Sequence, residues 1–142
     1  MTAPTVPAPL EMSFIVSNLL PVAAMKTVLI VEDEEALSYL LECVLREAGY
    51  RTSHAHNGAE ALACMEAALP DLIVSDLMMP VMDGVELCEV MSRDDHYLHI
   101  PVIIMSALYD LKPADGCNYV ARIHKPFDLD SVLTAVESSI GH

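Results

Sequence analysis

Residues 71–84 read DLIVSDLMMPVMDG, and this stretch decides the fold. Its short apolar run, LIVS at 72–75, ends in the acid Asp76, which is typical of a buried parallel strand. Residues 77–84 contain Pro80 and end in Asp83-Gly84, which predicts a loop, and residues 85–93 are patterned as a helix. The stretch therefore predicts a strand, a loop and a helix, in that order.

The same alternation extends along the chain in both directions. Further strands are predicted at VLIVE (28–32), RTSHAH (51–56), IPVIIMS (100–106) and YVARIH (119–124). Helical patterns lie between them at 35–48 and 57–69, and a last helix follows Pro126. Because crossovers between parallel strands need a helix and are right-handed, the pattern predicts an α/β fold with one parallel sheet covered on both faces.

Length and composition limit the classes of protein that fit. The 142 residues suffice for one domain with its own core, and 54% hydrophobic content excludes a disordered chain. The chain has seven Lys and Arg residues but 21 Asp and Glu residues, which gives a formal net charge of −14. Such a surface repels phosphate backbones and anionic lipids, so we expect no direct binding to nucleic acid or to a membrane surface.

The remaining features of composition concern location and the first residues. No apolar stretch reaches 18 residues, so no transmembrane helix is expected. The four cysteines form no C-x-x-C pair, and we expect them to be reduced in a cytoplasmic protein; they are Cys43, Cys64, Cys88 and Cys117. Residues 1–24 carry four prolines and are interpreted as a flexible extension, with a docking segment as the alternative, and the domain is expected over 25–142.

Polar side chains follow the predicted strands at their carboxyl ends, where ligands bind in such sheets. The first strand leads into Glu32 and Asp33, and the third ends in Asp76. The fourth ends in Ser106, and Lys125 follows the fifth. Three carboxylates this close repel one another unless a cation lies among them, and hard oxygen ligands favour Mg²⁺. The ion, the Lys125 ammonium and the Ser106 hydroxyl could neutralise a phosphoryl group arriving at Asp76, which would then act as nucleophile.

Four motifs in this order and spacing resemble the receiver domain of two-component response regulators; they are VLIVEDE, DLIVSDLMMPVMDG, PVIIMSA and HKPF. The resemblance covers residues 26 to about 140. It implies a doubly wound, flavodoxin-like (βα)5 sheet with strand order 2-1-3-4-5. It also implies a signalling module, a phosphoacceptor that assists its own phosphorylation and dephosphorylation. The expected partners are a sensor histidine kinase or a histidine phosphotransfer protein, and a downstream protein target.

The resemblance also assigns roles to residues. It implies that Asp76 is the phosphoacceptor, that Asp33 binds Mg²⁺ directly, and that Glu32 binds it through water. The backbone carbonyl of Met78 would complete the protein ligands. Ser106 resembles the switch hydroxyl, and Lys125 the lysine that pairs with the phosphoryl group, with a cis bond from Lys125 to Pro126.

Two departures from the family pattern concern signalling. The aromatic residue usual three positions before the Lys-Pro pair is replaced by Arg122. Residues 107–118 show no sustained apolar stripe and contain Pro113 and Gly116, so the fourth helix is expected to be short, irregular or absent. We therefore expect partners to bind the first or the last helix of the domain.

Other functions remain as alternatives. A nucleotide- or flavin-binding enzyme would need a glycine-rich or hydroxyl-rich phosphate loop after the first strand, where this chain has EDEE. An aspartate-nucleophile phosphatase would want an acid where Met78 lies. The main alternative is a pseudo-receiver, the same fold acting as a phosphorylation-independent binding module. The histidines at 54, 56, 96 and 99 have no carboxylate or cysteine at metal-site spacing and are expected to be surface residues.

Overall fold

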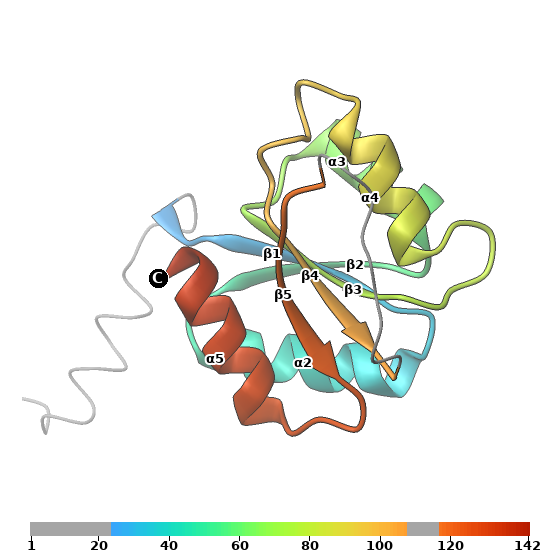
Figure 1. The fold of residues 1–142 in the computed structure, drawn as a ribbon. Coiled ribbons are helices and arrows are strands. Elements are labelled where there is room, and N and C mark those ends of the chain that lie inside the picture. The colour runs from blue at the N-terminus through green and yellow to red at the C-terminus, as the bar shows by residue number, and fades with distance from the viewer. Residues whose placement is uncertain (1–23, 108–116) are drawn as a thin grey trace, which may run out of the picture.

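The sheet has five parallel strands, as predicted. The computed structural model describes residues 24–107 and 117–142. The strands follow the order β2-β1-β3-β4-β5, which confirms the 2-1-3-4-5 topology of a flavodoxin-like fold (Figure 1). Their bounds are Thr27–Val31 (β1), Arg51–Ala55 (β2), Leu72–Asp76 (β3), Val102–Ser106 (β4) and Tyr119–His124 (β5).

Helices cover both faces of the sheet. They are α2 (Glu35–Glu47), α3 (Gly58–Ala67), α4 (Gly84–Ser92) and α5 (Leu129–Ile140). Helices α2 and α5 pack on one face, and α3 and α4 lie on the other (Figure 1). Three helices begin at side chains that accept a backbone N–H of the first turn, as N-caps do; they are Asn57, Asp83 and Asp128.

Two expectations fall on residues that the structure does not describe. The extension at 1–24 lies outside the described residues except for Ala24. The irregular fourth helix was expected within 107–118, of which 108–116 lie outside the described part of the chain.

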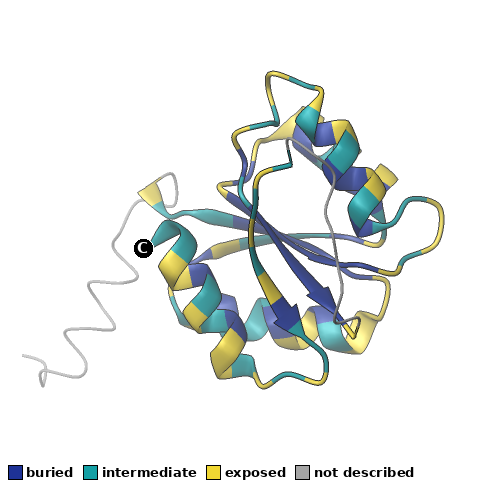
Figure 2. Ribbon diagram, viewed as in Figure 1, coloured by how far each residue is buried: buried dark blue, intermediate teal, exposed yellow. Residues whose placement is uncertain are grey.

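The three central strands are almost completely buried, whereas the two edge strands are not (Figure 2). All five residues of β3 and of β4 are buried. Side chains of the sheet alternate between two apolar cores, one under α2 and α5 and one under α3 and α4. The apolar runs in the sequence thus form strands that lie between two layers of helices, as expected for parallel sheets.

The edge strand β5 is irregular where it begins. Val102 pairs with Tyr119 while Ile103 pairs with Ala121, so the register shifts by one residue at Val120. Beyond the shift the pairing is regular as far as Ser106 and His124. The last residues of β4 and β5 therefore lie side by side.

The expectation of four reduced cysteines is wrong for one pair. The structure joins Cys88 of α4 to Cys117 in a disulfide, with Cα atoms 5.5 Å apart, whereas Cys43 and Cys64 are free. The sequence could not show this pairing, because the two residues are 29 positions apart and meet only through the packing of α4 against the start of β5.

The end of α5 is anchored at the edge where the strands begin. The Tyr50 hydroxyl donates to the Gly141 carbonyl at 2.7 Å, and the rings of Tyr50 and His142 stack. The Lys26 ammonium, just before β1, donates to the carbonyl of Ile140. Within residues 24–107 and 117–142, none of the helices combines the length and the apolar character that a membrane crossing requires.

Candidate functional site

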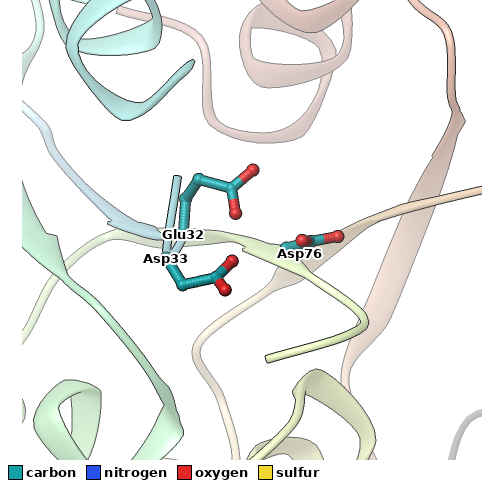
Figure 3. A group of neighbouring side chains, drawn as sticks. All are labelled: Glu32, Asp33 and Asp76. Carbon is teal, nitrogen blue, oxygen red and sulfur yellow. The ribbon is translucent and has the colours of Figure 1, made fainter. Parts of the chain in front are cut away.

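Three carboxylates meet where β1 and β3 end (Figure 3). Because Val31 pairs with Ser75, Glu32 follows β1 at the level of Asp76, the last residue of β3. Asp33 is the next residue in the loop. Glu32, Asp33 and Asp76 offer oxygen atoms that all lie within 4.8 Å of one another. The structure thus brings together the three acids that the sequence singled out, and we call this group the acidic site.

One ammonium group contacts the acidic site. Lys125 Nζ lies 3.1 Å from Asp76 Oδ1 and 3.5 Å from Glu32 Oε1. The backbone N–H of Lys125 donates to the Ser106 carbonyl at 2.8 Å, which holds the start of the loop after β5 against β4. The bond from Lys125 to Pro126 is cis, as the sequence predicted.

Burial and charge make Glu32 unusual. Glu32 is only 1% exposed. Burial is the largest cause that raises its pKa, to about 7, and repulsion from the Asp76 carboxylate is the second, whereas the Lys125 ammonium lowers it. Burial alone would lower the pKa of Lys125, but the carboxylates of Asp76 and Glu32 outweigh burial and raise it. The lysine therefore stays positively charged, but this one positive charge does not balance the negative charge of the acidic site.

A buried oxygen of Glu32 has no partner. Among the described residues, Glu32 Oε2 finds no hydrogen-bond donor. A buried carboxylate oxygen without a donor is costly, and a hydrated cation is one way to satisfy it. The donor set consists of hard oxygen atoms next to a single ammonium. The residues present therefore fit a small hydrated divalent cation such as Mg²⁺.

The two remaining predicted residues lie beside the cluster. Ser106 is 2% exposed and follows Met105, the residue of β4 that pairs with Asp76. Met78 lies two residues after Asp76, and its residue is 69% exposed. Because a thioether is a soft ligand and Mg²⁺ takes oxygen atoms, the backbone carbonyl is the group that Met78 can offer to such an ion.

Two glycines that sequence reasoning passed over position the loop after Asp76. Gly84 N donates to the Leu77 carbonyl at 2.9 Å, and a Cβ on Gly84 would lie 2.6 Å from the Asp76 carbonyl oxygen. At the other side of the loop, Gly58 N donates to the Met82 carbonyl at 2.9 Å. The Asp-Gly and Asn-Gly pairs in the sequence were signals of turns, but which backbone each glycine contacts depends on the tertiary packing.

Comparison with known proteins agrees with this geometry. The model of the response regulator receiver domain family matches residues 28–137. The chain is 34% identical over 122 residues to the polar-differentiation response regulator DivK of Brucella anthropi, covering 82% of this chain and 97% of DivK. It is 35% identical to the DNA-binding transcriptional regulator NtrC of Escherichia coli, covering 80% of this chain but only 24% of that longer protein.

A solved structure adds a likeness of the overall fold. The receiver domain of a sensor histidine kinase from Pseudomonas aeruginosa, which has a magnesium ion coordinated in its active-site cleft, superimposes with a TM-score of 0.74. The two sequences are 25% identical, and the match covers 84% of this chain and all of the other. With the family model, the DivK relative and the five-stranded topology in agreement, this chain belongs to the family of response regulator receiver domains.

Proposed function

We propose that the protein takes a phosphoryl group onto Asp76 in a Mg²⁺-dependent step and signals by a change of conformation. The donor is the phosphohistidine of a histidine kinase or of a histidine phosphotransfer protein. The observation that carries the proposal is the acidic site, in which Glu32 and Asp76 are buried and Asp33 is exposed, with Lys125 Nζ 3.1 Å from Asp76 Oδ1 and an oxygen on Glu32 that has no hydrogen-bond partner among the described residues. A receiver domain in a kinase, as in the Pseudomonas neighbour, supports a histidine donor.

The transfer follows from the groups around Asp76. A carboxylate oxygen of Asp76 attacks phosphorus, the new P–O bond forms as the P–N bond to the donor imidazole breaks, and the imidazole takes up a proton. Lys125 offers its ammonium to the phosphoryl oxygens as the negative charge spreads over them. The ion, held by Asp33, Asp76, the Met78 carbonyl and, through water, Glu32, would supply further positive charge for those oxygens.

The fate of the acylphosphate involves Ser106. Its hydroxyl lies at the end of β4, one residue beyond the position that pairs with Asp76. We propose that this hydroxyl moves onto the phosphoryl group and transmits phosphorylation to the surface around β5. Arg122, exposed on that strand, takes the place where the family usually has an aromatic ring.

We place the partner surface at the first helix. A cleft of about 470 Å³ is lined by Leu37 of α2, by Phe127 and by Lys125, whose ammonium contacts the acidic site. Tyr39 and Leu40 on the same helix are 66% and 49% exposed. Apolar side chains that remain exposed on the helix directly after Glu32 and Asp33 suit a transient protein partner. Hydrogen–deuterium exchange with a cognate kinase should therefore protect α2 or α5.

Location and partner class follow the expectations from composition. We propose that the protein acts in the cytoplasm on a protein target, without direct binding to nucleic acid or membrane. The net charge of −14 supports the exclusion of anionic partners.

Intact-mass spectrometry tests the proposal. The wild type, incubated with Mg²⁺ and a small-molecule phosphodonor, should gain one phosphoryl group, and EDTA should abolish the gain. Asp76→Ala should gain nothing, whereas Glu34→Gln, a change in an exposed acid of the same loop, should behave like the wild type. A folded wild type that gains nothing would contradict the proposal and favour the pseudo-receiver.

A further inference from the structure

A second group of metal-ligating side chains lies at the sheet edge formed by β2. His54 and His56 are two residues apart, so both extend toward α2, and their ring centroids are 4.5 Å apart. The two histidines line a cleft of about 380 Å³ together with Glu35 and Glu42 of α2. We use the name histidine cleft for Glu35, His54, His56 and the neighbouring Glu60.

Hydrogen bonds define which nitrogen of each ring can bind an ion. His54 Nε2 lies 2.9 Å from the carbonyl oxygen of Glu32, which can only accept, so Nε2 carries the proton and Nδ1 keeps its lone pair. His56 Nδ1 lies 2.9 Å from Glu60 Oε1 and donates to that carboxylate. This leaves His56 Nε2 as the second lone pair, on the side of Glu35.

The ligand atoms of Glu35, His54 and His56 do not all lie within 4.8 Å of one another, so a single ion would have to draw the exposed Glu35 carboxylate in toward the two rings. His56 Nε2 lies 3.8 Å from Glu35 Oε1, and two ligand atoms bound to one tetrahedral ion at about 2.0 Å are roughly 3.3 Å apart. Two imidazole rings bound to such an ion have centroids roughly 5 Å apart, close to the separation of His54 and His56. The Glu35 side chain is 86% exposed and can rotate to close the remaining distance.

We propose that His54 Nδ1, His56 Nε2 and the Glu35 carboxylate bind one divalent transition-metal ion of the Zn²⁺, Co²⁺ or Ni²⁺ class. Imidazole nitrogen selects this class over Mg²⁺, which prefers oxygen ligands, so the histidine cleft and the acidic site take different ions. Glu60 is a positioning residue, because its bond to His56 Nδ1 orients the ring and increases the basicity of Nε2. Water would complete the coordination.

Calorimetric titration with Zn²⁺ tests the proposal in millimolar Mg²⁺, which competes with Zn²⁺ for the acidic site. The wild type should bind one equivalent of Zn²⁺. His56→Gln should weaken this binding at least tenfold, and Glu60→Gln should weaken it by a smaller factor. His96→Gln is the matched control, because His96 also contacts a carboxylate, Asp94, but lies outside the cleft, and it should bind like the wild type.

Two further measurements separate the site from other sources of binding. Co²⁺ added to the wild type should give the visible absorption of a tetrahedral site with nitrogen ligands, and His54→Gln should lose it. Asp76→Ala should retain the Zn²⁺ equivalent. Zn²⁺ binding that is lost in Asp76→Ala, or that persists unchanged in His56→Gln, would overturn the proposal. His56 is an exposed side chain, so its variant is expected to fold, and circular dichroism checks this.

Discussion

The central strands and the edge strands of this sheet contribute to function in different ways. β1, β3 and β4 lead to Glu32, Asp76 and Ser106, which are 1%, 8% and 2% exposed. β2 and β5 lead to His56 and Lys125, whose side chains are 46% and 26% exposed. The central strands therefore hold charged groups together where water cannot screen them, whereas the edge strands supply groups that solvent still reaches.

This difference shows at which positions holding charged groups close together costs free energy. Buried carboxylates cannot separate to relieve their repulsion, because the strands that carry them are fixed between two helical layers. The result is a raised pKa for Glu32 and an orphaned oxygen, and both favour a cation. Exposed side chains at the edges can rotate, so a contact there costs less and contributes less.

The largest contrast is expected in stability. Ile103, completely buried in β4, is packed on all sides, so Ile103→Ala should lower the free energy of unfolding by about 2–5 kcal/mol through lost burial and a new cavity. Val120→Ala on β5, where Val120 is 46% exposed, should change it by no more than about 0.5 kcal/mol. Urea unfolding measures both, and equal losses would show that the edge is packed as tightly as the centre.

The pH dependence of stability should differ in the same way. In EDTA, the folded protein keeps Glu32 protonated up to a pKa of about 7, whereas the unfolded chain ionises this residue near 4.5. The stabilisation from Glu32 is thus complete below about pH 4.5 and is lost as the pH rises through 7, a change on the order of 1–3 kcal/mol.

Two variants isolate that contribution by thermal unfolding from pH 4.5 to 8. Glu32→Gln should flatten the decline, since the amide does not ionise. At the edge, the hydrogen bond from Glu60 raises the pKa of the exposed His56 above 6.5, so Glu60→Gln should remove only a small decline above pH 6.5 and should leave the decline between pH 4.5 and 6.5 as in the wild type. A Glu32→Gln curve parallel to the wild type would contradict the buried charge as its origin.

Substitutions of two glycines test whether the backbone is also packed more tightly after the central strand β3 than after the edge strand β2. A methyl group on Gly84 would meet the carbonyl oxygen of Asp76 at 2.6 Å, and the backbone of β3 cannot yield. Gly84→Ala should therefore cost about 1–3 kcal/mol and reduce phosphorylation. Gly58→Ala, after the edge strand β2, meets Cγ, Sδ and Cβ of Met82 at 2.6–3.0 Å, and because Cγ and Sδ can rotate away while Cβ cannot, it should cost less than Gly84→Ala. Chemical denaturation and the phosphorylation assay measure both variants.

The smallest expected effect concerns Lys125, which follows the edge strand β5 and contacts the carboxylates at the ends of the central strands. Lys125 competes with a metal ion for Asp76 and Glu32, so Lys125→Met should bind Mg²⁺ about three- to tenfold more tightly, roughly 1 kcal/mol. It should at the same time accept phosphate more slowly, because one positive group is missing at the phosphoryl oxygens. Mg²⁺ titration gives the affinity, and Lys26→Met, far from the site, serves as the control. Weaker Mg²⁺ binding by Lys125→Met would mean that the lysine organises the acids rather than competing for them.

Most of the acidic site could be predicted because parallel strands end at one edge. Glu32 and Asp76 each follow an apolar run, so topology alone brings them together. The partners of His56 could not be found this way. Glu35 and Glu60 reach it from two helices, and only the packing of those helices against β2 places the carboxylates at the ring. The pairing of Cys88 with Cys117 and the contact of Gly84 with Asp76 depend on packing in the same manner.

The bond from Lys26 to the end of α5 has a consequence for engineering. Lys26 precedes β1 and Ile140 closes the last helix, so the part of the chain that runs from β1 to α5 begins and ends at one place, at the edge opposite Asp76. A unit of this kind can be spliced into a surface loop of another protein with short connectors at both ends. Such an insertion would leave the acidic site facing outward, and the end of α5 would be joined directly to the host through its connector.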